Sequence, residues 1–169
     1  MKKIIIVLSM LISSVAIAQK HNIVNASIAL RNAKKATGDD IGVLLAEAKD
    51  YIDLAYSNES TSNEPKMWNY RAPIYLEIAL KKPELDNKAI LKATDSYIKC
   101  LTKGKKDRII VRKWTPKEDV LAGLIQCGYK LFNLGIDKYN EGDYQSSLDF
   151  YEKIFAIVPF DEEDQLKRG

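Results

Sequence analysis

The sequence contains little of what catalytic and metal-binding sites require. His21 is the only histidine, and there are two cysteines and eight glycines among 169 residues. A zinc site or a histidine-based triad therefore has little support, and the glycines form no phosphate-binding loop. Carboxylates occur at Asp39–Asp40, Glu59 and Glu162–Asp164, but no histidine or cysteine accompanies them at ligand spacing, so we interpret them as solvated surface. We expect no catalytic residue, no metal site, no cofactor and no enzyme activity in this chain alone.

A long hydrophobic run is also missing. The longest largely apolar stretch, Ile4–Ala18, has 15 residues, whereas a membrane-spanning helix needs about 20. Lys2 and Lys3 precede it and Ala16-Ile17-Ala18 closes it, the pattern of a secretory signal peptide. We therefore expect residues 1–18 to be removed and the rest to be exported to the periplasm or the extracellular side of a bacterial envelope. An uncleaved anchor is the alternative, and no cysteine follows the cleavage site to carry a lipid.

The chain has almost no net charge once the signal peptide is removed. Residues 19–169 form one predicted domain of 151 residues, and the formal charge falls from +3 to +1 because Lys2 and Lys3 leave with the signal. This balance favours neither nucleic acid nor a membrane as partner. One basic connector stands out, and it could dock an acidic partner or anionic lipid head groups, although a solvated connector is the simpler interpretation. Its cations are Lys103, Lys105, Lys106, Arg108, Arg112 and Lys113.

The two cysteines leave two alternatives open. Export would bring Cys100 and Cys127 into an oxidising compartment, where a disulfide is permitted. Two thiols in a helical chain are more often small buried core residues. Their spacing matches no metal motif.

Strand patterns are absent apart from a short basic segment, Arg108–Trp114, whereas helical spacing recurs throughout. Three stripes repeat at i, i+4 and i+7, each opening on a small residue with a large one a turn later. Small residues let a neighbouring helix approach closely. Such internal repetition is typical of stacked helix pairs, so we predict an all-α fold. The stripes are Ala48-Ile52-Ala55, Ala93-Tyr97-Cys100 and Ser147-Tyr151-Ile154.

Each stripe has a predicted partner helix upstream. These partners are residues 25–35, residues 65–78, and a long helix that runs from Thr115 to Tyr139 or Asn140. Thr115, Pro116 and Glu118 have the order of a capping box with proline at the first helical position.

The last helix pair has the clearest sequence signals for its turn and its end. Gly142-Asp143-Tyr144 predicts a tight turn, because glycine permits a left-handed backbone and the tyrosine can pack back into the hairpin. Pro159 is expected to end the second helix, since proline cannot donate the next helical hydrogen bond.

These residues resemble the tetratricopeptide repeat family. The segment 131–159 looks like one repeat, with Leu134-Gly135 in its first helix and Ser147, Tyr151, Ile154 and Pro159 in its second half. A second repeat resembles the pattern through Trp68, Tyr75 and the Ala93 stripe, with an insertion at Lys82–Asp86. A first repeat matches only in Ala48–Ala55, after a turn at Gly38-Asp39. An export signal with long, irregular repeats is similar to exported envelope repeat proteins of Bacteroidetes-type bacteria.

The resemblance implies antiparallel helix hairpins stacked as an α-solenoid. It also implies a non-catalytic scaffold that binds a protein or peptide of unknown identity on the inner face of the first helices. A self-assembling structural solenoid, or the non-catalytic part of a longer enzyme or secretion component, is the alternative. Asp161–Asp164 follow Pro159 where a further helix would start, so the array could continue. The implied partner-binding residues are Lys66, Asn69, Pro73, Leu76, Tyr129, Phe132, Asn133, Ile136 and Tyr139.

Overall fold

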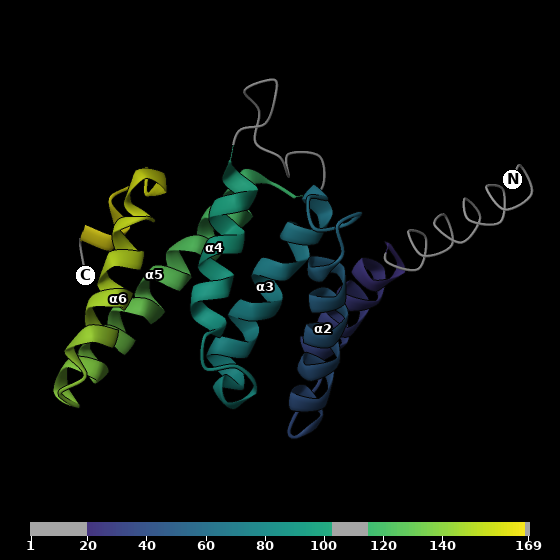
Figure 1. Ribbon diagram of the computed structural model, residues 1–169, viewed down its shortest axis with the longest axis horizontal. Helices are drawn as coiled ribbons and strands as arrows, with labels where there is room; N and C mark the ends of the chain where they lie inside the picture. Colours follow the sequence, from purple (N-terminus) through teal and green to yellow (C-terminus); the bar gives the residue numbers. More distant parts are fainter. Residues whose placement is uncertain (1–19, 103–114, 168–169) are drawn as a thin grey trace, which may run out of the picture.

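A computed structural model describes residues 20–102 and 115–167, and all regular structure in these two ranges is helical (Figure 1). The all-α prediction is therefore confirmed. The predicted signal peptide, the basic connector and the strand candidate Arg108–Trp114 lie outside the described residues. The described elements are a first helix over residues 20–33, α2 (Asp40–Ser57), α3 (Pro65–Lys81), α4 (Ala89–Leu101), α5 (Lys117–Asn140) and α6 (Tyr144–Phe155), with short 3-10 turns at Pro83–Leu85, Val158–Phe160 and Gln165–Lys167.

The helices stand side by side in chain order, with the first helix and α2 at one end and α5 and α6 at the other (Figure 1). The most extensive contacts join α3 to α4 and α5 to α6. Contacts from α2 to α3 and from α4 to α5 connect one pair to the next. None of the described helices is long and apolar enough to cross a membrane.

The predicted stripes form the core of this row. All six residues of the first two stripes, from Ala48 to Cys100, are buried. In the third stripe Ser147 is buried, while Tyr151 and Ile154 are half-buried. The close approach of α5 to α4 and to α6 depends on two glycines of α5. A Cβ on Gly123 would lie 2.3 Å from the Tyr97 ring of α4, and a Cβ on Gly135 would lie 2.9 Å from the Tyr151 ring of α6. The tyrosines of the stripes thus fill grooves that only glycine leaves open.

A polar cluster that the sequence did not predict fixes α3 against α2. The buried Arg71 donates to Asp53 at 2.9 Å, and the Tyr75 hydroxyl donates to the same carboxylate at 2.6 Å. The Arg71 guanidinium also lies over the Tyr56 ring, 4.2 Å from its centroid. Burial and the bond to Asp53 raise the pKa of Tyr75 above its ordinary value. Because each charged group has a partner, the cluster can be buried without leaving a charge unpaired.

The turns before α2 and α6 confirm two predictions and correct a third. Gly38 and Gly142 have positive φ, at 63° and 80°, and the Asp143 side chain caps α6 by accepting from the Ser146 N–H at 3.2 Å. Tyr144, however, remains 64% exposed. It packs edge-on against the Tyr139 ring, since the hairpin interior is already filled by Tyr151 and Ser147.

Two predicted helix boundaries are wrong. The capping box at Thr115 does not form: α5 begins at Lys117, and Pro116 stands before it in an extended conformation with no side-chain cap. At the other boundary, α6 ends at Phe155, four residues before Pro159, which instead lies in the turn Val158–Phe160. The helix ends early because Ile157 is fully buried and its N–H donates to the Ile154 carbonyl at 2.8 Å, which tightens the chain into a turn.

Cys100 and Cys127 are both buried free thiols, so the core alternative holds and the disulfide is not formed. Burial raises the pKa of each thiol to about 12. A thiol with such a pKa is almost entirely protonated near neutral pH and is a poor nucleophile.

Candidate functional site

The structure separates the residues that the repeat resemblance assigned to one inner face. Leu76 on α3 is wrong as a contact residue, because it is only 5% exposed and packs in the core. Asn69 and Pro73, one turn apart on the same helix, are half-buried and line a separate hollow of about 360 Å³ with Tyr97 and Asp119. Pro73 cannot donate to the carbonyl of Asn69. Of the α3 residues, Leu76 is therefore buried, while Asn69 and Pro73 line a hollow that does not include the exposed residues of α5 from Tyr129 to Tyr139.

The α5 part of that face is exposed and continuous. Tyr129, Phe132, Ile136 and Tyr139 are three or four residues apart, which places them on one side of a helix, and Asn133 lies next to Phe132 and four residues from Tyr129. All are exposed, and Tyr139 is 61% exposed. These residues, Tyr129, Phe132, Asn133, Ile136 and Tyr139, stay together as predicted, and Phe132 also packs against the Tyr151 ring of α6.

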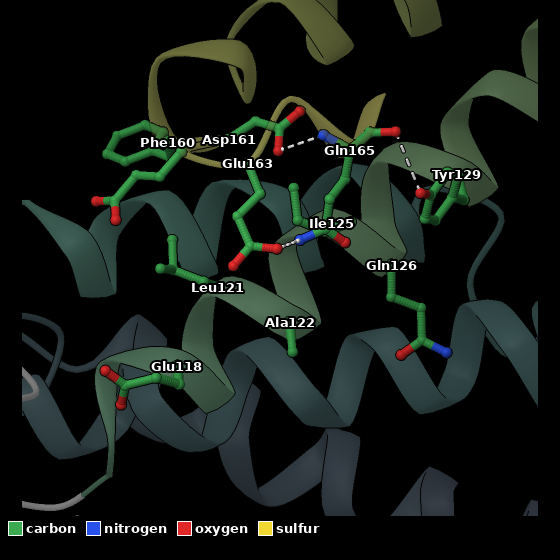
Figure 2. Close-up of a pocket in the computed structure, with 11 residues that line it drawn as sticks. Glu118, Leu121, Ala122, Ile125, Gln126, Tyr129, Phe160, Asp161, Glu163 and Gln165 are labelled. Atoms are coloured by element: carbon green, nitrogen blue, oxygen red, sulfur yellow. Dashed lines mark hydrogen bonds between the residues drawn. The ribbon is translucent and has the colours of Figure 1, made fainter. Parts of the chain in front are cut away.

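A groove that the sequence did not predict begins at Tyr129 and follows the same side of α5 toward its N-terminus. It has a volume of about 430 Å³ and lies between α5 and the segment after α6 (Figure 2). Leu121 and Ile125 form its apolar floor, four residues apart, and Tyr129 continues that spacing. The groove is lined by Glu118, Leu121, Ala122, Ile125, Gln126 and Tyr129 of α5 and by Phe160, Asp161, Glu162, Glu163 and Gln165 of the facing segment.

Asp161 builds the wall of this groove. Its side chain is 8% exposed, and its two carboxylate oxygens accept from the backbone N–H groups of Gln165 at 2.9 Å and Leu166 at 2.8 Å. These charge-assisted bonds close the segment into a compact turn. The sequence analysis interpreted Glu162–Asp164 as solvated surface and did not consider the adjacent Asp161. The sequence signal for the role of Asp161 is a carboxylate that precedes a short helical turn, as in a helix cap.

Three further contacts hold the wall against α5. The Tyr129 hydroxyl donates to the Gln165 carbonyl at 3.3 Å (Figure 2). Leu166 lies so close to Gly128 that a Cβ there would be 2.6 Å from a Leu166 methyl carbon. Lys117 at the start of α5 forms an ion pair with Glu162. The groove is thus a built feature of the fold, held at both ends.

The groove combines an apolar floor with an acidic rim. Glu118 stands on the α5 side, and Glu162 and Glu163 stand on the facing segment, all exposed. Lys117, which pairs with Glu162, is the neighbouring cation. Such a surface attracts cationic groups and holds apolar ones. Among residues 20–102 and 115–167, no group of three or more histidine, cysteine, aspartate or glutamate side chains could hold a metal ion.

Comparisons with known proteins add no family to this description. No family model matches the chain, and neither the curated proteins nor the solved structures contain a match. The candidate site therefore stands on its own geometry.

Proposed function

We propose that this chain is an exported, non-catalytic scaffold built as a tetratricopeptide-like α-solenoid, and that it binds another protein in a bacterial envelope through the groove on α5. The groove itself carries the proposal: a hollow of about 430 Å³ with Leu121 and Ile125 at its floor and carboxylates at its rim. The neighbouring stripe from Phe132 to Tyr139 extends the apolar surface along the same helix. Support for the solenoid comes from the paired helices and their repeated stripes, and support for export comes from the pattern of residues 1–18.

The chemistry of the groove defines the kind of partner that fits. Apolar anchors set into a pocket supply most of the affinity in protein recognition, and charges at the rim supply orientation and speed of association. The preferred ligand is a peptide segment or helix of another protein with one or two apolar side chains flanked by lysine or arginine. An acidic segment of equal hydrophobicity would meet like charges at Glu118, Glu162 and Glu163.

Fluorescence anisotropy with two matched peptides tests this function. Both peptides carry the same leucine and phenylalanine anchors, one with flanking lysines and the other with flanking glutamates. We expect the basic peptide to bind and the acidic one to bind at least about tenfold more weakly. Equal binding, or none by either peptide, would contradict the proposal.

Two variants of Tyr129 and one control locate the binding surface. Tyr129→Ala removes an aromatic wall of the groove and should weaken the basic peptide by about tenfold or more. Tyr129→Phe keeps the ring and loses only the bond to Gln165, so it should weaken binding less. Val43→Ala is the control, because Val43 on α2 is 69% exposed and lies outside both the groove and the stripe from Phe132 to Tyr139. Equal effects at Tyr129 and Val43 would place the binding elsewhere.

A further inference from the structure

The outer face of α6 lacks the cover that the corresponding face of α4 has. When the stripes beginning at Ala93 and Ser147 are aligned, Leu148 corresponds to Thr94 and Phe155 corresponds to Leu101. Thr94 is fully buried and Leu101 is 5% exposed, whereas Leu148 is 51% exposed and Phe155 is 73% exposed. Larger apolar side chains thus stand on α6 where α4 has covered ones.

The helix that covers α4 shows what is missing at α6. The Thr94 side chain faces Cys127 of α5, so this face of α4 is the one on which the next pair begins. In the same way α3 packs on α2. After α6, the segment up to Lys167 folds over α5, with Leu166 against Gly128, and it leaves Leu148 and Phe155 exposed. The occupant that fits is therefore the first helix of a further pair.

The first helix of this same chain has a complementary outer surface, at the opposite end of the row (Figure 1). Val24 and Ile28 lie one turn apart and are 42% and 41% exposed. Arg31, which is also exposed, continues this stripe at helical spacing.

Charge distinguishes the two ends. Residues 20–38 contain three lysines and one arginine and no carboxylate, and two of these lysines, Lys20 and Lys34, already form ion pairs with Glu64 and Glu77. Residues 141–156, the turn and α6, contain four carboxylates and one lysine, and that lysine, Lys153, already pairs with Asp95 of α4 at 2.8 Å.

On the two apolar faces themselves, Arg31 continues the stripe of Val24 and Ile28, and Glu152 lies between Leu148 and Phe155; both are exposed. These opposite charges attract the two faces and orient them.

We propose that the outer face of α6 binds the first helix of a second copy of this chain, so that copies join head to tail and continue the row of helices. This contact uses different surfaces on the two copies, and a contact of this type propagates into open chains unless its rotation closes a ring. The surface is Leu148, Glu152 and Phe155, and it is separate from the groove that Glu118, Leu121 and Glu163 line. Head-to-tail assembly and partner binding can therefore occur together.

Sedimentation velocity over a concentration series, on protein produced from the complete sequence, measures the association. The average mass should rise with concentration and fall with added salt, since the charges of the two faces are screened. Leu148→Gln should weaken association by more than about tenfold if this side chain is an anchor. Leu80→Gln is the matched control, because Leu80 on α3 is 40% exposed and belongs to neither end. A mass equal to the monomer throughout, or equal effects of both variants, would overturn the proposal.

A mixing experiment identifies the head-to-tail arrangement. Phe155→Asp spoils the α6 face, and Val24→Asp spoils the first helix; both positions are exposed, and circular dichroism checks that each variant is folded. Each variant alone should be monomeric, while an equimolar mixture should form a dimer that grows no further, because each chain retains one intact face. Absence of this dimer, or association of Val24→Asp alone, would overturn the arrangement. Both variants should keep the affinity of the α5 groove for the basic peptide, which separates this test from that of the proposed function.

Discussion

The helices α4 and α6 carry the same stripe of small and large residues but meet different surroundings. Eight of the 13 residues of α4 are buried, whereas Ser147 is the only buried residue among the 12 of α6. The difference comes from neighbours: α4 contacts α3 on one side and α5 on the other, while α6 packs mainly against α5. A sequence stripe therefore specifies which side of a helix can be buried, and the next helix decides whether it is.

The same contrast appears along α5. Gly123 faces the buried ring of Tyr97 on the α4 side, and Gly128 faces the flexible end of Leu166 on the side of the terminal segment. Both glycines allow close approach, but one neighbour is locked in the core and the other is the tip of a short turn. Equal substitutions in one helix should consequently have unequal costs.

The largest expected effect separates the equivalent positions Leu101 and Phe155. Leu101→Ala removes a buried side chain and should lower the free energy of unfolding by about 2–5 kcal/mol. Phe155→Ala changes an exposed one and should stay within about 0.5 kcal/mol. Urea denaturation at low protein concentration, where copies are separate, measures both. Similar losses at the two positions would mean that α6 is covered as fully as α4.

The two glycines of α5 give the next largest difference. Gly123→Ala places a Cβ 2.3 Å from the Tyr97 ring, and the repacking this forces should cost about 1–3 kcal/mol. Gly128→Ala meets only the Leu166 methyl groups, which can move, and the better helix propensity of alanine is worth up to about 1 kcal/mol. We expect it to be neutral or slightly stabilising by the same denaturation measurement. A loss at Gly128 equal to that at Gly123 would show that the terminal segment is as rigid as the core.

A smaller effect is expected at the stripe position itself. The Ser147 hydroxyl donates to the carbonyl of Gly135 at 2.8 Å across the α5–α6 interface, where α4 has Ala93. Ser147→Ala should lower the free energy of unfolding by about 0.5–1.5 kcal/mol, the usual net worth of one such bond. A neutral result would indicate that close packing alone joins α6 to α5.

The smallest expected effect is that the two native cysteines do not react with an alkylating reagent. Cys100 and Cys127 are buried, and burial raises the pKa of each thiol to about 12. Near neutral pH, alkylation of the native protein should therefore proceed only as fast as the chain opens. In dilute protein, where copies are separate, the variant Leu148→Cys should add one thiol that reacts rapidly, because position 148 is exposed. Rapid labelling of the unsubstituted protein would contradict the covered α4–α5 interface.

Much of the fold could be predicted from the sequence because it depends on local rules. Helical spacing and glycine at the turns 38 and 142 each act within a few residues, and these predictions were confirmed. Two of the failures involve distant partners: Leu76 is buried by its neighbours, and the α6 terminus is set by the burial of Ile157. The third is local, because the capping box at Thr115 does not form although its pattern is present.

The candidate site was predicted only in part for the same reason. The exposed stripe from Tyr129 to Tyr139 follows from helical spacing along α5. The groove beside it requires the terminal segment to fold back, which depends on Asp161 accepting backbone N–H groups and on Leu166 reaching Gly128. The one signal for that return is Asp161, which has the character of a helix cap. Glu162 and Glu163 are exposed, as interpreted, but their place at the rim of a groove could not be predicted without the return.

Hydrogen exchange by mass spectrometry tests most directly whether α6 lacks the cover that α4 has. In dilute protein, backbone amides of α4 should exchange only on global unfolding, and those of α6 should exchange much faster, because opening α6 breaks fewer buried contacts. At high concentration, exchange should slow in α6 and in residues 20–33 together, as each covers the other in neighbouring copies. Equal protection of α4 and α6 in dilute protein, with no change on concentration, would contradict the account.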